Sequence, residues 1–178
     1  MEEFKSLEQI LQIDERHLLL GQLTGRMHSL ESLHASLAAI ELHPGVPEDV
    51  RGQFNVARNM AMYTLFHYAM APEVQMKTFS VIELGLKRRL PEAAGKGLAG
   101  LLKAAVARGL LCDAGFRHIK NPNPDNDYCK NLVTVIPTLR NEAAHGSTSL
   151  TPHVLGYIEV CADLLNQLFA NDSARGVP

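Results

Sequence analysis

The sequence has few cysteines and no long apolar run, and both absences narrow the class of protein. Its three cysteines, Cys112, Cys129 and Cys161, are an odd number without CxxC spacing. This argues against a disulfide framework or a zinc site and favours a reducing compartment. No apolar run approaches the ~18 residues of a membrane span, and no basic segment followed by an apolar stretch opens the chain. We therefore expect a cytoplasmic protein with no signal peptide and no membrane partner.

Signatures of nucleotide and metal binding are also missing. The chain contains neither a Walker-type GxxxxGK[ST] loop nor a GxGxxG turn, which removes the most recognisable phosphate-binding loops. His28 and His34 are six residues apart and share no helix face with a carboxylate at ligand spacing. No cofactor and no metal site are therefore expected.

The length of the chain indicates one domain, and its charge is unevenly distributed along the sequence. The 178 residues suit one domain with a core of its own. Residues 1–76 carry 5 basic and 10 acidic side chains, whereas residues 77–145 carry 11 basic and 6 acidic ones. The middle of the chain is therefore the part expected to face a polyanion, and a solvated charged face is the simpler interpretation.

Apolar residues recur at three- and four-residue steps along most of the chain, and this period predicts helices. The expected helices cover residues 5–12, 14–42, 48–70, 72–90, 97–111, 129–146 and 151–170. Gly21 and Gly25 weaken the second helix and are expected to bend it. The predicted fold class is all-α, an antiparallel bundle of five to seven helices, because most connections are short.

Residues 132–136 are compatible with either a strand or a helix, and the chain as a whole is expected to divide into three parts. The β-branched run at 132–136 resembles a strand, but its apolar spacing favours a helix that is kinked or restarted at Pro137. Residues 1–45 are expected to pack on or extend the bundle, residues 46–170 to form it, and residues 171–178 to be a flexible tail.

The residues best suited to chemistry end the predicted helix 129–146. Residues 140–145, RNEAAH, have the form R-x4-H, which occurs once in the chain. Arginine offers a positive planar fork to phosphate oxygens, and histidine exchanges a proton near neutral pH. The structural alternative is that Arg140 caps carbonyls or pairs with a carboxylate, while His145 is attracted to the helix dipole.

This motif resembles that of the HEPN domains, small α-helical bundles with an R-x(4–6)-H motif that often has asparagine directly after the arginine. The loop before this helix and the single helix after it are similar to HEPN order, and the resemblance covers roughly residues 48–170. It implies that Arg140 and His145 form a catalytic pair supported by Asn141.

The resemblance also implies a function and partners. Many HEPN proteins are metal-independent endoribonucleases that work as homodimers in toxin–antitoxin, abortive-infection or other phage-defence systems. RNA would then be the substrate, and an antitoxin or defence component would be a partner. Other members are inactive and serve in nucleotide or nucleic-acid binding or in assembly. A helical regulator of duplex DNA is a weaker alternative, because no helix is strongly basic along one face.

The spacing of the motif sets a geometric constraint. Five residues along an ideal helix turn by about 500°, so Arg140 and His145 would lie about 140° apart and share no face. Either the helix unwinds at 144–146 and lets His145 turn back, or a second subunit supplies the complement across a two-fold axis. The second solution agrees with the resemblance and predicts a homodimer.

Two charged residues fall on apolar helix faces and need partners there. Arg58 is in line with the apolar residues of helix 48–70, and Glu83 with those of helix 72–90. We expect Arg58 and Glu83 to pair across the two helices, or Glu83 to orient Arg140. A purely structural ion pair is the favoured interpretation for Arg58.

Four basic residues are candidates for contacts with an RNA backbone. Lys87 and Arg88 end helix 72–90, where they either clamp RNA or complement the helix dipole in solvent. Arg117 and Lys120 lie in the loop before the motif helix, a position from which they can contact phosphate.

Overall fold

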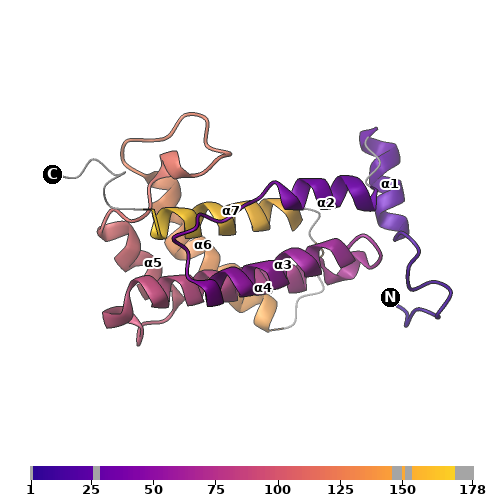
Figure 1. The fold of residues 1–178 in the computed structure, drawn as a ribbon, viewed down its shortest axis with the longest axis horizontal. Helices are drawn as coiled ribbons and strands as arrows, with labels where there is room; N and C mark the ends of the chain where they lie inside the picture. The colour runs from indigo at the N-terminus through magenta and orange to yellow at the C-terminus, as the bar shows by residue number, and fades with distance from the viewer. Residues whose placement is uncertain (1, 26–28, 146–149, 151–153, 171–178) are drawn as a thin grey trace.

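The computed structural model describes residues 2–25, 29–145, 150 and 154–170. Over these ranges the chain is a bundle of seven α-helices without strands, which confirms the all-α prediction (Figure 1). The helices are α1 (Glu15–Thr24), α2 (Leu30–Ala38), α3 (Glu48–Tyr63), α4 (Ala71–Arg89), α5 (Leu98–Ala107), α6 (Asp127–Ala144) and α7 (Val154–Leu168). Single 3₁₀ turns lie at Tyr68–Met70, Pro91–Ala93 and Asp113–Gly115.

Helix α4 is central to the bundle. It packs against α3, α5, α6 and α7, and buried side chains are spread along its whole length. Its contact with α7 is close because Gly85 has no side chain: a Cβ there would lie 2.3 Å from Cδ2 of Leu165. The core is apolar and continuous around this helix.

The predicted helix at residues 5–12 is wrong. Residues 7–11 form turns, and Leu7, Ile10 and Leu11 are exposed. A helix of two turns is unstable in water unless tertiary packing holds it. This segment has apolar residues at helical spacing, but its apolar side chains are exposed to solvent and do not pack in the core.

The predicted long helix at 14–42 is two helices. Gly25 ends α1 with φ of +68°, a left-handed conformation that glycine adopts without strain. The apolar stripe divides with it: Leu33 and Leu37 are buried on α2, whereas Leu19 and Leu23 on α1 face solvent.

The other predicted helix boundaries differ less from those in the structure. Helix α3 ends at Tyr63, well before the predicted end at 70. Helix α6 runs unbroken through Pro137, so the strand alternative at 132–136 is wrong and the helix does not restart there. The start of the last predicted helix at 151–153, the stop at Gly146 and the tail at 171–178 lie outside the described residues.

Candidate functional site

Helix α6 carries the R-x4-H motif, and its first turn is capped by a residue from another segment. The buried carboxylate of Asp113 accepts hydrogen bonds from the amides of Tyr128 at 3.2 Å and Cys129 at 3.0 Å. Asn126, which precedes the helix, provides no side-chain cap but accepts a bond from the Asp113 amide at 2.9 Å. Burial alone would raise the pKa of Asp113, but the amide donors outweigh burial and lower it. This exchange of bonds fixes the start of the helix.

The other end of α6 exposes Arg140, Asn141 and His145. The His145 amide donates to the Asn141 carbonyl at 3.1 Å, which continues the helical pattern of bonds to the motif's last residue. The helix therefore does not unwind before His145, and Gly146 lies outside the described residues. Arg140 and His145 follow one helical path and, five residues apart, point about 140° away from each other.

A hollow of about 290 Å³ lies beside Arg140. Residues of α4, α6 and the start of α5 line it: Glu83, Gly97, Leu98, Ala99, Pro137, Arg140 and Asn141. The structure thus brings Glu83, Arg140 and Asn141 to one place, while His145 is not part of the lining. Arg140 makes one long contact of 3.4 Å with the Asn141 side chain and forms no ion pair within the described residues.

The expected Arg58–Glu83 pair is wrong. Arg58 donates to the Leu37 carbonyl at 2.7 Å and so joins α3 to the end of α2. Glu83 pairs instead with Lys87, one turn along α4, at 2.6 Å. No direct bond joins Glu83 to Arg140 in the part of the chain that the structure describes, so any influence on Arg140 acts across the hollow.

Most of the basic residues predicted to contact RNA already have acidic partners. Three of the four form ion pairs: Lys87 with Glu83, Arg88 with Asp49 and Arg117 with Asp163. Lys120 is exposed and has no such partner over the described ranges. Their contact with nucleic acid stays a prediction.

The Arg117–Asp163 pair has a structural role. The nearly buried carboxylate of Asp163, on α7, accepts bonds of 2.9 Å from both Nε and the backbone amide of Arg117. A buried carboxylate needs such donors, since its desolvation is costly. The loop before α6 is therefore attached to α7 through this residue.

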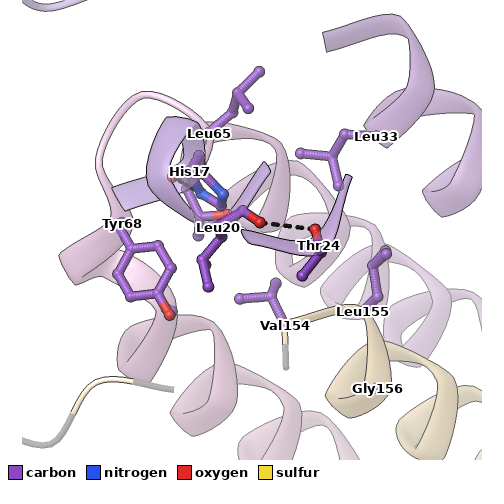
Figure 2. Close-up of a pocket in the computed structure, with 11 residues that line it drawn as sticks. His17, Leu20, Thr24, Leu33, Leu65, Tyr68, Val154, Leu155 and Gly156 are labelled. Atoms are coloured by element: carbon purple, nitrogen blue, oxygen red, sulfur yellow. Dashed lines mark hydrogen bonds between the residues drawn. The ribbon is translucent and has the colours of Figure 1, made fainter. Parts of the chain in front are cut away.

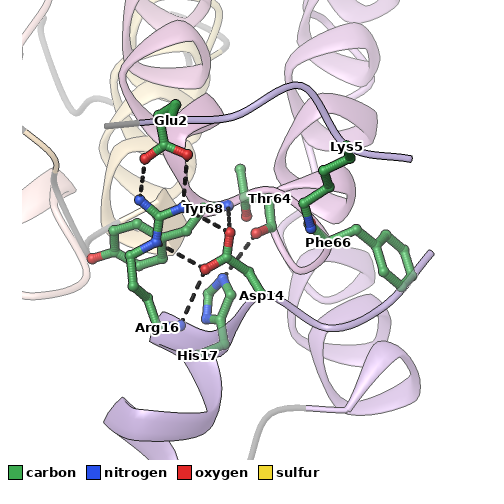
Figure 3. Close-up of polar contacts among 8 residues, drawn as sticks. All are labelled: Glu2, Lys5, Asp14, Arg16, His17, Thr64, Phe66 and Tyr68. Carbon is green, nitrogen blue, oxygen red and sulfur yellow. Dashed lines mark hydrogen bonds and ion pairs between the residues drawn. The ribbon is translucent and has the colours of Figure 1, made fainter. Parts of the chain in front are cut away.

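A second polar cluster, which the sequence did not predict, holds the N-terminal segment (Figure 3). The Asp14 carboxylate caps α1 through the Arg16 amide and accepts further bonds from the Arg16 side chain at 2.8 and 2.9 Å. The Tyr68 amide also donates to it, at 2.9 Å. Arg16 in turn pairs with Glu2 and lies over the Tyr68 ring. Asp14 before a helix is a recognisable cap signal, but nothing in the sequence indicates its contact with Tyr68.

Hydrogen bonds in this cluster favour the charged forms of Asp14 and Arg16. Burial alone would raise the pKa of Asp14, but hydrogen bonds from Arg16 and from the Tyr68 amide bring it well below its usual range. Hydrogen bonds to Asp14 and then to Glu2 raise the pKa of Arg16. Lys5 and His17 complete the attachment by donating to the Phe66 and Thr64 carbonyls at 2.6 and 2.9 Å.

An apolar pocket of about 300 Å³ lies where α1 meets the bundle (Figure 2). Its lining comes from α1, α2, the α3–α4 connection and the start of α7: His17, Leu20, Thr24, Leu33, Thr64, Leu65, Tyr68, Ala71, Val154, Leu155 and Gly156. The Thr24 hydroxyl is already bonded to the Leu20 carbonyl at 2.7 Å. The pocket contains no carboxylate, lysine or arginine, and it lacks an arrangement for acid–base chemistry.

The cysteines and the metal-ligating side chains form no site over the described ranges. All three cysteines are free, and burial raises the pKa of Cys129 to about 12, which keeps its thiol protonated. No group of three or more His, Cys, Asp or Glu side chains in these ranges is arranged around a metal position. Nor does any described helix combine the length and apolar character that crossing a membrane requires.

The motif at the end of α6 is therefore the candidate site: an exposed arginine without an acidic partner, an adjacent asparagine and a histidine on another face. Comparison with protein-family models, with curated proteins and with solved structures finds no match to this chain.

Proposed function

We propose that the chain is a metal-independent endoribonuclease of the HEPN type, in which Arg140 and His145 carry the chemistry and Asn141 supports them. The observation that carries the proposal is the state of Arg140. Lys87, Arg88 and Arg117 are neutralised by acidic side chains, whereas Arg140 is exposed beside a hollow and has no ion pair within the described residues. An uncompensated guanidinium is suited to an RNA phosphate.

The proposed reaction needs only the substrate and these side chains. The RNA 2′-oxygen attacks the neighbouring phosphorus, so that an O2′–P bond forms and the P–O5′ bond breaks. A neutral His145 takes the 2′-hydroxyl proton, and a protonated His145 of a second copy gives a proton to the leaving 5′-oxygen. Arg140 stabilises the additional negative charge on the phosphorane oxygens. The products are a 2′,3′-cyclic phosphate and a 5′-hydroxyl.

The proposal includes a homodimer. In one copy the continuous helix points Arg140 and His145 away from each other. A two-fold axis near the end of α6 would place Arg140 of one copy opposite His145 of the other. A toxin or phage-defence setting, with an antitoxin or other defence partner, belongs to the same proposal and rests on the motif's resemblance alone.

A second candidate function is a catalytically inactive module that contributes to assembly or nucleic-acid binding. The observation that favours it is the number of exposed apolar side chains near the N-terminus, among them Phe4, Leu7 and Leu23. Exposed apolar side chains of this kind suit a protein contact, whether or not RNA is cleaved.

The test is an RNA-cleavage assay in EDTA with mixed single-stranded and structured RNA. Arg140→Ala and His145→Ala are compared with Arg51→Ala and His34→Ala, which remove an exposed arginine and an exposed histidine elsewhere. We expect cleavage to survive chelation, to fall by at least about 100-fold in the two motif variants, and to persist in the controls. Circular dichroism checks that all variants fold.

Two results would contradict the proposal. A folded, dimeric wild type that cleaves none of the RNAs would favour the inactive module. Cleavage that persists in both motif variants would remove Arg140 and His145 from the site.

A further inference from the structure

The apolar pocket of about 300 Å³ where α1 meets the bundle is built by segments that lie far apart in the sequence (Figure 2). Four of them each give an aliphatic side chain to the lining: Leu20 (α1), Leu33 (α2), Leu65 (α3–α4 connection) and Val154 (α7). Three of these side chains are buried. Protein interiors contain few voids larger than a water molecule, so a space of this volume among buried aliphatic residues indicates room for a ligand.

Three of the four polar side chains in the lining are already bonded to backbone carbonyls. The His17 ring is bonded to the Thr64 carbonyl at 2.9 Å. The Thr24 hydroxyl donates to the Leu20 carbonyl, and the Thr64 hydroxyl to the Ala61 carbonyl, each at 2.7 Å. These bonds fasten the walls of the pocket to each other.

Tyr68 is the fourth polar side chain, and its hydroxyl has no hydrogen-bond partner within the described residues. Tyr68 is only 8% exposed, its amide is held by Asp14, and its ring packs edge-on against His17. Burial raises the pKa of Tyr68, so the phenol is protonated at neutral pH and can donate. A nearly buried hydroxyl without an acceptor is unfavourable, and an acceptor on a ligand would relieve this.

The lining selects against charged ligands. None of its described residues is a lysine, arginine, aspartate or glutamate, so an ion would lose its hydration without gaining a counter-ion. Phosphates and carboxylates are therefore poor occupants. Arg140, Asn141 and His145 are not in the lining, so this pocket is separate from the motif at the end of α6.

The volume sets the size of the occupant. An apolar cavity of about 150 Å³ accommodates one benzene ring. A pocket of about 300 Å³ therefore suits a molecule of roughly two fused rings. Water is a poor alternative, because ordered water needs about two to four polar partners and the lining side chains offer one hydroxyl that is not engaged.

We infer that this pocket binds a neutral, mainly apolar small molecule of about two fused rings, whose single carbonyl or ether oxygen accepts a hydrogen bond from the Tyr68 hydroxyl. The inference stands on the volume of the pocket, its uncharged lining and the unpartnered hydroxyl, and it holds whether or not the chain cleaves RNA. Because the occupant contacts α1, α2 and α7 at once, its binding strengthens the attachment of α1 to the bundle.

The probe is 2-acetylnaphthalene, which has two fused rings and one carbonyl, and its binding to the full-length protein is measured by equilibrium dialysis. The matched probe is 2-naphthoate, which keeps the rings but carries a negative charge. We expect saturable one-to-one binding of the ketone and binding of the carboxylate that is weaker by at least about 100-fold. Nuclear Overhauser effects from the ketone to the methyl groups of Leu33 and Val154 should locate it in the pocket.

Two variants test the site directly. Tyr68→Phe removes only the unpartnered hydroxyl and should weaken ketone binding by about two- to tenfold, whereas Tyr63→Phe, an exposed tyrosine on α3, should not. Leu20→Trp fills the pocket and should weaken ketone binding by more than about tenfold, whereas Leu19→Trp, exposed on the same helix, should not. Circular dichroism checks that every variant folds.

Three results would each overturn the inference. They are the absence of saturable ketone binding, ketone binding that is unchanged in Tyr68→Phe or in Leu20→Trp, and naphthoate binding as tight as that of the ketone. None of these measurements contains RNA, so they succeed or fail independently of the proposed cleavage.

Discussion

The carboxylate of Asp14 accepts a hydrogen bond of 2.9 Å from the backbone amide of Tyr68, 54 residues further along the chain. The same carboxylate caps α1 and receives two bonds from the Arg16 side chain. A single nearly buried group therefore determines where α1 starts and where it sits on the α3–α4 connection.

Replacing this group should lower stability in a pH-dependent way. Asp14→Asn keeps an acceptor for the Tyr68 amide but removes the ion pair with Arg16, so we expect a loss of about 1–2 kcal/mol at neutral pH. The folded pKa of Asp14 is lowered, so its contribution is complete above the unfolded value of about 3.9 and is lost as pH falls through the folded value.

Urea unfolding of both proteins from neutral pH to acid pH checks this. The difference between wild type and variant should shrink as pH falls below about 4. Asp125→Asn is the control, since the exposed Asp125 carboxylate accepts no hydrogen bond in the described ranges. A constant difference across the whole range would show that Asp14 acts by packing alone.

Asp113 should matter for α6 and for the motif at its end. Asp113→Ala leaves the amides of Tyr128 and Cys129 without their acceptor, and loss of a helix cap costs about 1–2 kcal/mol. Hydrogen exchange should accelerate first in the amides of the opening turn of α6. Exchange that is unchanged there would contradict the capping role.

Glycine at two helical positions should respond to alanine with opposite signs. At Gly85 a Cβ would meet Leu165, which is fully buried and has no room to move, so Gly85→Ala should destabilise by about 1–3 kcal/mol. At Gly52, in the interior of α3, nothing lies within 4 Å, so Gly52→Ala should stabilise by up to about 1 kcal/mol. Urea midpoints measure both, and equal effects would show that the α4–α7 contact is looser than described.

If cleavage is found, the two motif variants should complement each other. A heterodimer of Arg140→Ala with His145→Ala retains one intact arginine and one intact histidine on different copies. Because one copy's helix points these side chains apart, the mixture keeps one opposed Arg140–His145 pair but loses one of the two histidine proton transfers. We therefore expect activity well below that of the wild type and above that of either variant alone. A mixture as inactive as its components would place both residues of the working site on the same copy.

The sequence predicts the central helices well because each of them is long and has apolar residues at helical spacing. The spacing of apolar residues locates α4, α5, α6 and α7 to within a few residues, and the structure buries Ile158, Cys161 and Leu165 as that spacing requires. Pro137 resembles a helix break, yet α6 continues through it since a proline removes only one bond from a helix that tertiary packing supports.

The same periodicity fails near the N-terminus for a physical reason. Spacing identifies which side chains share a helix face, but it does not say what that face meets. Leu19 and Leu37 belong to one apparent stripe, and only Leu37 reaches the core because Gly25 turns the chain between them. The sequence does not identify the partners of Arg58 and Glu83, because a charge on a helix face does not fix how neighbouring helices are rotated.

The long-range bond between Asp14 and Tyr68 also sets an order of events during synthesis. Asp14 leaves the ribosome before Tyr68, its bonding partner 54 residues further along the chain. Lys5 likewise leaves before Phe66, whose carbonyl accepts its hydrogen bond. Residues 2–16 therefore take their final positions only after the α3–α4 connection has folded. A nascent chain that stops short of Tyr68 lacks this anchor, so the attachment of α1 is coupled to the completion of the α3–α4 connection.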